Sequence, residues 1–147
     1  MELVTRVRSA KTSDVSVLAK LADKLIPGEA STSDRIRVLT RTLRRSDYSL
    51  YVAEKDRRLL GFVDLWVFPD FAHGGKMGII QNLFVDRTFR RRGIGDLLMR
   101  RVTRRAGELK LKELHVWTTF RNRAAISLYR KHGLTRKSLL LEREFER

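Results

Sequence analysis

The sequence contains no cysteine, only two prolines and no long apolar run, and each absence excludes a class of protein. Without cysteine, a disulfide framework, a thiolate nucleophile and a cysteine-ligated metal site are excluded. No stretch approaches the roughly 20 consecutive apolar residues of a membrane-spanning helix. Residues 1–6 lack the apolar core of a secretory signal, so we expect a cytoplasmic protein with no membrane partner. The three histidines are scattered along the chain, and we expect no metal site.

Acidic side chains are also scarce, because 17 Asp and Glu face 32 Lys and Arg, for a formal net charge of +15. Such an excess favours a polyanionic partner, which can be nucleic acid, an acidic membrane or a phosphorylated small molecule. A chain this poor in Gln, Asn and Cys also fits the compositional bias of thermophiles. The charge is concentrated in residues 87–105, where eight Arg accompany a single acid, Asp96, and we therefore expect anion binding there.

With 42% hydrophobic residues and no proline-rich linker, the 147 residues predict a single α/β domain around one mixed sheet. Apolar residues at helical spacing predict helices near 15–25, 33–43, 93–106 and 122–132. Strands are predicted at 4–8, 49–53, 59–68, 77–85, 114–119 and 139–145. Residues 77–85 are apolar on both faces, which is typical of a central buried strand.

The segment from residue 85 to residue 96 joins this buried strand to an amphipathic helix. The first turn of a helix has unpaired N–H groups and a positive dipole end, which together favour phosphate. Gly93 and Gly95 would let the backbone approach an anion closely, and the arginines at 90–92 add charge beside them. No Gly-Lys-Ser/Thr follows and position 98 is Leu, so the segment is neither a P-loop nor a dinucleotide-binding fingerprint.

Two motifs within residues 77–135 match a known pattern in residue type and spacing. The first is Arg90-x-x-Gly93-x-Gly95 after a strand that ends in Leu83-Phe84-Val85-Asp86. The second, residues 122–134, follows the pattern Asn-x-x-Ala-x-x-Leu-Tyr-x-x-x-Gly-Phe, with Leu134 in place of the usual Phe. Together they resemble the GNAT superfamily of acetyl-CoA-dependent N-acetyltransferases. The resemblance implies a single GNAT-like domain with a mixed, mostly antiparallel sheet flanked by helices, whose splayed strands form the acyl-CoA site.

The same resemblance implies where the cosubstrate, acetyl-CoA, would bind. Its pyrophosphate would lie on backbone N–H groups from about Arg91 to Asp96, and its pantetheine arm between the strands at 83–85 and 116–118. A backbone N–H near Phe84 would hold the thioester oxygen, which stabilises the oxyanion of the intermediate. Asn122 would cap its helix and contact the cosubstrate arm. The implied binding residues are Leu83, Phe84, Val85, Arg90, Arg91, Arg92, Gly93, Ile94, Gly95, Asp96 and Asn122.

Tyr129 is the candidate general acid. The family places this acid at the tyrosine of its Leu-Tyr step, which here is Tyr129. A phenol with a pKa of about 10 holds its proton at neutral pH and can donate it to a departing thiolate whose pKa is about 8.5. The alternative is a core tyrosine without a chemical role, since Ala125 and Tyr129 could share one apolar stripe.

The general base, which would take a proton from the attacking amine, is less clearly marked. Positions where some family members carry a Glu hold Ile79 and Trp117 here. His115 is the candidate we select, because it lies beside Trp117 on the same face of its strand and histidine is the side chain that most often serves as a general base. Asp64, Glu29 and a water chain to the solvent are the alternatives.

Two other functions fit parts of the sequence. A basic nucleic-acid-binding module would fit the charge, but the aromatic-rich strands of single-strand binders are missing, so nucleic acid is not expected as a specific partner. A GNAT-fold protein that binds CoA without acetyltransferase activity is the other. The acceptor, an amine of a small molecule, peptide or protein, is expected at the first two helices and residues 26–33, whose few acids give no support to a polycation. The oligomeric state is open, with a homodimer as one option.

Overall fold

The computed structural model describes residues 4–145, which build a six-stranded sheet in the order β1-β2-β3-β4-β6, with β5 also beside β3. All neighbouring strands are antiparallel except β4 and β6, which run parallel. The predicted α/β class with a mixed, mostly antiparallel sheet is therefore confirmed. The strands are β1 (Arg6–Ser9), β2 (Tyr48–Lys55), β3 (Arg58–Asp70), β4 (Gly75–Ile80), β5 (Leu83–Val85) and β6 (Glu113–Val116).

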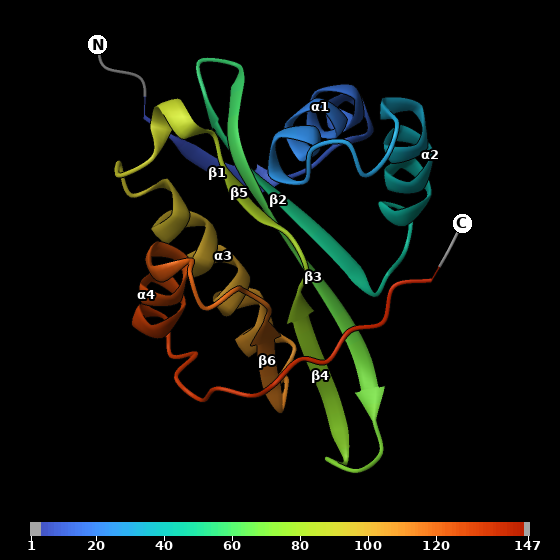
Figure 1. Ribbon diagram of the computed structural model, residues 1–147, viewed down its shortest axis with the longest axis vertical. Helices are drawn as coiled ribbons and strands as arrows, with labels where there is room; N and C mark the ends of the chain where they lie inside the picture. The colour runs from blue at the N-terminus through green and yellow to red at the C-terminus, as the bar shows by residue number, and fades with distance from the viewer. Residues whose placement is uncertain (1–3, 146–147) are drawn as a thin grey trace.

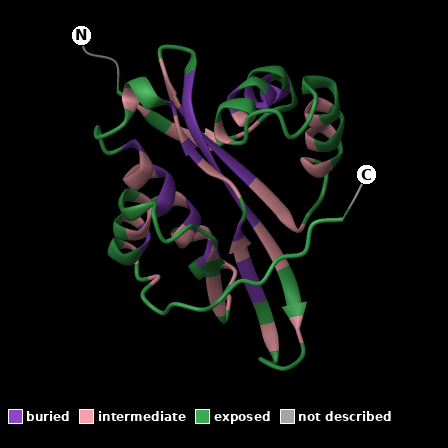
Figure 2. Ribbon diagram, in the orientation of Figure 1, coloured by how far each residue is buried: buried purple, intermediate pink, exposed green. Residues whose placement is uncertain are grey.

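Within residues 4–145, four α-helices flank the sheet, and Figure 1 shows them as two pairs on its two faces. The pairs are α1 (Val15–Leu25) with α2 (Thr32–Thr42), and α3 (Ile94–Glu108) with α4 (Arg123–Lys131). Side chains alternate along β2, so Leu50 and Val52 pack under α1 while Tyr51 and Ala53 pack under α3. Burial is accordingly greatest in the central strands and on the inner faces of α1 and α3 (Figure 2). None of the described helices is long and apolar enough to cross a membrane.

The residue before each of three helices explains why the helix begins there. The Ser31 hydroxyl accepts a hydrogen bond from the Asp34 N–H at 3.0 Å, and the Asn122 side chain accepts one from the Ala125 N–H at 3.2 Å. These side chains satisfy N–H groups that have no partner inside the helix. Gly93 precedes α3 with a φ of +77°, a conformation that side chains with a Cβ rarely adopt. The capping role predicted for Asn122 is thus confirmed.

The prediction of a single strand over residues 77–85 is wrong, because the strand is interrupted at Gln81 and Asn82 and forms two strands, β4 and β5. Both backbone N–H groups donate to one oxygen of the Asp64 carboxylate, at 2.9 and 2.8 Å. The Asn82 carbonyl accepts from the Asp64 N–H at 3.0 Å. A buried carboxylate on β3 therefore replaces two ladder partners and separates β5 from β4.

The final strand predicted at 139–145 is also wrong, since no strand follows β6 among residues 4–145. The segment runs as irregular chain (Figure 1), and Leu139, Leu141 and Phe145 are exposed. Its apolar pattern suits a strand, but a strand also needs a neighbour to pair with, and this segment has none among the described residues. Other predicted ends shift by a few residues: β3 continues to Asp70, and β6 ends at Val116.

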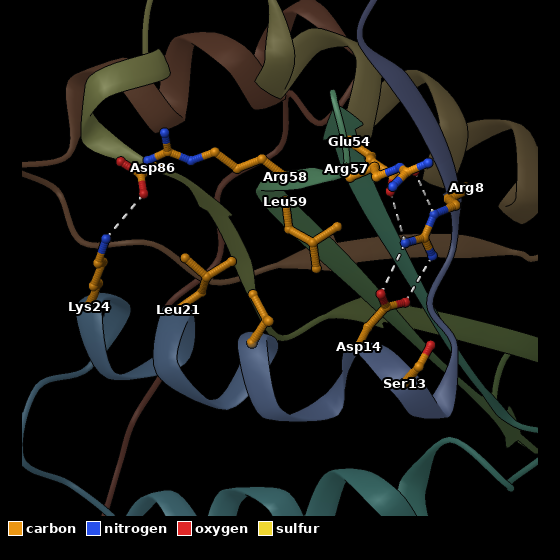
Figure 3. A pocket seen from close by; sticks show the side chains of 11 residues that line it. Arg8, Ser13, Asp14, Leu21, Lys24, Glu54, Arg57, Arg58, Leu59 and Asp86 are labelled. Carbon is orange, nitrogen blue, oxygen red and sulfur yellow. Dashed lines mark hydrogen bonds and ion pairs between the residues drawn. The ribbon is translucent and has the colours of Figure 1, made fainter.

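An ion-paired cluster ties β1 to α1 and β2, on the side of the molecule shown in Figure 3. It borders a cavity of about 470 Å³. The Arg8 guanidinium donates to both carboxylate oxygens of Asp14, at 2.8 and 3.0 Å, and its Nε donates to Glu54 at 2.9 Å. Nearby, Lys24 pairs with Asp86 at 3.1 Å. Because each of these charges has a partner of opposite sign, we interpret the cluster as structural.

We expect Arg8→Met to lower the free energy of unfolding by about 1–3 kcal/mol at neutral pH, since it leaves two carboxylates without their donor. Arg8 lowers the pKa of Asp14, so this stabilisation is present above the usual carboxyl pKa near 4 and is lost as the pH falls through the lowered value. Urea unfolding of both proteins between pH 7 and pH 3 measures the effect. The matched control is Arg6→Met, because the Arg6 side chain is 77% exposed. Equal losses for both variants, or a loss at Arg8 that is as large at pH 3 as at pH 7, would contradict this prediction.

Candidate active site

A gap opens in the sheet where β5 leaves the line of β4. The pairing of β4 with β6 runs from Met77↔Glu113 to Ile80↔Val116. After the break, β5 pairs only with β3, from Gly61↔Val85 to Val63↔Leu83. Among the described residues, nothing pairs with the other edge of β5, which faces the β6 side. The predicted splaying of these strands is confirmed.

The backbone of β5 presents Leu83 and Val85 to this open edge. The Phe84 carbonyl faces β3, because a Cβ on Gly61 would stand 2.4 Å from its oxygen. Since backbone groups of successive strand residues point to opposite sides, the N–H and C=O of Leu83 and Val85 point away from β3. The Arg90 Nε donates to the Val85 carbonyl at 3.1 Å, as this orientation requires.

The chain after β5 turns into α3 through a basic segment that contains two left-handed residues. Arg91 has a φ of +63° and Gly93 a φ of +77°. No atom lies within 4 Å of the place where a Cβ on Gly93 would stand, so the turn is open there. The first hydrogen bond of α3 runs from the Leu97 N–H to the Gly93 carbonyl, at 3.1 Å. The preceding N–H groups, from Ile94 to Asp96, have no helical acceptor and are suited to bind an anion.

Gly95 has a packing role in addition to the anion-binding role that its sequence position predicts. A Cβ on Gly95 would stand 3.0 Å from Cδ2 of Leu128 in α4 and 3.9 Å from Cγ2 of Val85. Its lack of a side chain therefore lets α3 pack closely against α4 and β5. The close approach is between the first turn of α3 and α4, beside the open turn at Gly93.

Asp96 links the first turn of α3 to the last turn of α4. Its Oδ1 lies 2.7 Å from His132 Nε2 and 3.2 Å from Lys131 Nζ, and its Oδ2 lies 3.1 Å from Arg100. The hydrogen bonds from His132 and Lys131 lower the pKa of Asp96. These contacts fix the anion-binding turn relative to the helix that carries Tyr129. The sequence does not reveal these contacts, because residues 96 and 132 belong to different helices and no local pattern pairs them.

Tyr129 is 7% exposed and lies in the core cluster under α3 and α4. Leu83, Val85 and Val116 pack against the same cluster, which therefore joins the helix of Tyr129 to the two strands that border the gap. Burial raises the pKa of its hydroxyl, which keeps the proton in place at neutral pH. The hydroxyl has no hydrogen-bond partner among the described residues, and it is therefore available to a ligand.

A cavity of about 460 Å³, which we call the α1–α2 cavity, lies between α1, α2 and the sheet. Its floor includes Asp64, Gln81 and Asn82, the residues at which β4 and β5 separate. The lining of the cavity therefore includes Asn82, the residue directly before β5. Its lining comprises Leu18, Ala19, Ala22, Leu25, Ile26, Glu29, Ala30, Asp34, Arg35, Val38, Leu39, Thr42, Tyr48, Leu50, Phe62, Asp64, Trp66, Gln81 and Asn82.

Asp64 is 1% exposed and accepts four hydrogen bonds. Besides the two backbone donors at the break, the Tyr48 hydroxyl and the Asn82 amide both donate to its Oδ2 at 2.9 Å. Burial raises the pKa of Asp64, while these donors oppose the rise. Because the donors occupy the available lone pairs, the carboxylate is better suited to hold the connection between β4 and β5 in place than to take a proton. From the sequence, Asp64 is predicted only as an alternative base, and its structural role is not indicated there.

We expect Asp64→Asn to destabilise the fold by about 1–3 kcal/mol, because an amide NH₂ would face N–H or O–H donors in place of one carboxylate oxygen. The break between β4 and β5 should loosen with it. Thermal unfolding measures the first effect, and amide hydrogen exchange at Gln81 and Asn82 measures the second. Asp56→Asn is the matched control, since Asp56 is an exposed turn residue with a φ of +51° that Asn tolerates. Unchanged stability and exchange in Asp64→Asn would show that the carboxylate does not hold the break.

His115 lies on β6, apart from both the α1–α2 cavity and the Tyr129 ring. It is exposed, and its Nε2 is 3.4 Å from Oε2 of Glu113. Its neighbours Leu114 and Val116 pack against the core under α3. His115 therefore points to the opposite face of the sheet from Tyr129, because side chains alternate along a strand. Of the other sequence candidates for the base, Asp64 and Glu29 line the cavity, and His115 does not.

The comparisons with known proteins agree on this fold. The chain has a TM-score of 0.88 to a transcriptional regulator from Bacillus halodurans C-125, at 17% identity, with 97% of this chain and 100% of that chain covered. It has a TM-score of 0.85 to the aminoglycoside N-acetyltransferase AAC(6')-Iy in complex with CoA, at 18% identity, with 98% and 97% covered. The fold is thus one found in N-acetyltransferases.

The sequence comparisons define the family. The model of the acetyltransferase (GNAT) family matches residues 17–134. The uncharacterized N-acetyltransferase YhfO of Bacillus subtilis (strain 168) is 30% identical over 132 residues, which cover 86% of this chain and 87% of that protein. N-alpha-acetyltransferase 30 of Dictyostelium discoideum is 42% identical over 59 residues, which cover 40% and 32%. The chain belongs to the GNAT family of N-acetyltransferases, and the resemblance drawn from its two motifs is confirmed.

Proposed function

We propose that this protein transfers the acetyl group of acetyl-CoA to a primary amine, which attacks the thioester directly. The observation that carries the proposal is the course of the open edge of β5. This edge begins beside the floor of the α1–α2 cavity and ends at the basic turn before α3. A cosubstrate extended along the edge would have its pyrophosphate at the turn and its thioester next to the cavity.

The phosphate end of the cosubstrate would be held by the turn and by the start of α3. The N–H groups from about Arg91 to Asp96 and the positive end of the helix dipole would bind the pyrophosphate. Eight arginines in residues 87–105 supply a strong positive field around it. Arg90 donates to Val85 and so also holds the turn against β5.

The reacting end would be held by β5 and Tyr129. Of the residues near Phe84, Leu83 and Val85 direct backbone N–H groups to the open edge, so one of these would stabilise the oxyanion. Tyr129 would then protonate the departing CoA thiolate. For the base, His115 remains a prediction from the sequence, while the lining of the cavity favours Glu29 or a chain of water molecules.

Two measurements test this proposal. Calorimetry should show that CoA binds the purified protein, and a thiol reagent should show CoA release from acetyl-CoA when primary amines are added. Binding of CoA without thiol release from any amine would leave a CoA-binding protein that is not an acetyltransferase. Absence of CoA binding, with tight and sequence-selective nucleic-acid binding that survives added salt, would overturn the proposal in favour of a nucleic-acid-binding protein.

A further inference from the structure

We propose that His132 is a positioning residue for the cosubstrate: its imidazole holds the Asp96 carboxylate away from the N–H groups that bind the pyrophosphate. This inference rests on the proposed function and adds a residue at the end of α4 to the binding of acetyl-CoA. Three features of the structure support it, namely the place of Asp96 in α3, the partners of its carboxylate, and a second aspartate at the same helical position.

Asp96 stands where an acidic side chain can block the anion site. It is the third residue of α3, and it is the one acid that accompanies eight arginines in residues 87–105. An acidic side chain at the third position of a helix can reach back to the free N–H groups at the start of that helix. A carboxylate that did so would occupy donors that the pyrophosphate needs, and it would repel the negative charge of the pyrophosphate.

Asp14 shows this backward arrangement elsewhere in the chain. It is the third residue of the single helical turn Thr12–Asp14, and its Oδ2 accepts a hydrogen bond from the Lys11 N–H, directly before that turn, at 2.7 Å. The Asp96 carboxylate accepts no backbone N–H among the described residues and contacts side chains instead. The N–H groups at the start of α3 are thereby left to a ligand.

His132 is the partner that determines the direction of the Asp96 side chain. Its Nε2 lies 2.7 Å from Oδ1 of Asp96, and the contact is largely buried, since 11% of the His132 side chain and 17% of the Asp96 side chain are exposed. The hydrogen bond from His132, followed by that from Lys131, lowers the pKa of Asp96 and keeps it ionised at neutral pH. An ionised carboxylate only accepts, so Nε2 carries the proton of this hydrogen bond.

The two other cations at Asp96 cannot replace the imidazole. Lys131 Nζ and Arg100 approach the carboxylate at 3.2 and 3.1 Å, but their side chains are 68% and 70% exposed. Ion pairs between such exposed side chains contribute little and hold a group weakly. Removal of the imidazole therefore frees the carboxylate to turn back onto the start of α3.

The position of Tyr129 depends on the backbone of this segment and not on the imidazole. The His132 N–H donates to the Tyr129 carbonyl at 3.0 Å, and the Leu134 N–H donates to the same oxygen at 3.1 Å. Both hydrogen bonds persist when the imidazole is replaced. A His132 variant should therefore change the affinity for the cosubstrate much more than the turnover with saturating acetyl-CoA.

Calorimetry with CoA and steady-state kinetics with acetyl-CoA test this role on His132→Leu, which has no hydrogen-bond donor in its side chain. We expect the dissociation constant for CoA and the KM for acetyl-CoA to rise at least tenfold, while kcat falls less than threefold. His132→Gln should lose less than threefold in affinity. Its amide nitrogen is as many bonds from the backbone as Nε2 of histidine, so it can still donate to Asp96.

Arg130→Leu is the matched control. Arg130 is an exposed basic residue in the same turn of α4, and among the described residues it forms no ion pair with Asp96. Its variant should bind CoA within twofold of the parent. Thermal unfolding shows whether each variant is folded in the assay. If His132→Leu does not fold, His132→Asn takes its place, because its amide nitrogen stops one bond short of Nε2.

A double variant separates this role from a purely structural one. In an Asp96→Ala background there is no carboxylate to turn back, so adding His132→Leu should change the dissociation constant for CoA less than threefold. If His132 only supported the fold, its loss would weaken CoA binding equally in both backgrounds.

The outcomes distinguish this inference from the proposed function. Equal CoA affinities of His132→Leu and Arg130→Leu, equal losses in His132→Leu and His132→Gln, or an undiminished loss in the Asp96→Ala background would overturn the positioning role and leave acetyl transfer intact. The expected losses of CoA affinity, without thiol release from any amine, would support the positioning role and overturn acetyl transfer. A parent protein that binds no CoA would overturn both.

Discussion

Tyr129→Phe should lower the turnover of acetyl transfer by roughly ten- to a thousandfold, the usual range for loss of one general acid. The substitution keeps the buried ring in the core cluster under α3 and α4 and removes only the hydroxyl. Because that hydroxyl has no partner among the described residues, its loss should leave the thermal midpoint nearly unchanged. The affinity for CoA should also change little, since the hydroxyl acts on the leaving group.

Steady-state kinetics and CoA calorimetry on the same preparation test this prediction. The matched control is Tyr51→Phe, because Tyr51 is 3% exposed in the same core cluster but lies on β2. Its turnover should equal that of the parent. The loss in Tyr129→Phe should shrink with an acyl donor whose thiol is more acidic, since such a group leaves with less protonation. Near-normal turnover in Tyr129→Phe would make this residue a core tyrosine, and a collapse of CoA affinity would make it a positioning residue.

Gly93→Val should raise the dissociation constant for CoA at least tenfold while the protein stays folded. The φ of +77° at this position disfavours a β-branched residue, with a strain of about 1–2 kcal/mol. No clash adds to the strain, because nothing lies within 4 Å of the new Cβ. The turn would relieve the strain by shifting, and the N–H groups that follow it would lose their common orientation toward the pyrophosphate.

Gly74→Val is the control for this effect. Gly74 has a φ of +66° and open space around it, but it lies in the turn between β3 and β4, away from the gap. Calorimetry should therefore give a normal CoA affinity for Gly74→Val, and the two variants should lose similar thermal stability. A folded Gly93→Val protein with unchanged CoA affinity would contradict the assignment of the pyrophosphate to this turn. Gly95 is a poorer test, because a side chain there would also push against Leu128.

The sequence predicts those parts of the molecule that local patterns determine. Apolar spacing and capping residues identify the helices, and the glycine turn and the Asn122–Tyr129 spacing identify the family. The break at Gln81 and Asn82 could not be read in this way, because the group that causes it, Asp64, lies on another strand. The segment 139–145 has the apolar pattern of a strand, but pairing depends on a neighbour that the pattern does not specify.

The site shows the same division between local and long-range information. Residues 83–96 and 122–132 carry the motifs, and their positions beside the gap follow from the order of the elements. The contact between Asp96 and His132 joins residues 36 positions apart. The α1–α2 cavity combines side chains from two helices, the loop between them and two strands with those of Gln81 and Asn82. The scarcity of acids in residues 26–33 gave no sign that three carboxylates, at positions 29, 34 and 64, would line one cavity.

The most direct test of the proposed function is the initial-rate pattern with acetyl-CoA and an amine that releases thiol, when the concentrations of both are varied. Direct attack on the thioester requires both substrates to be bound together, so double-reciprocal plots should intersect. The chain has no cysteine to carry an acetyl group, and the proposed site assigns no other residue to that role. Parallel lines, which indicate a covalent acetyl-enzyme intermediate released by a second substrate, would contradict the proposed transfer.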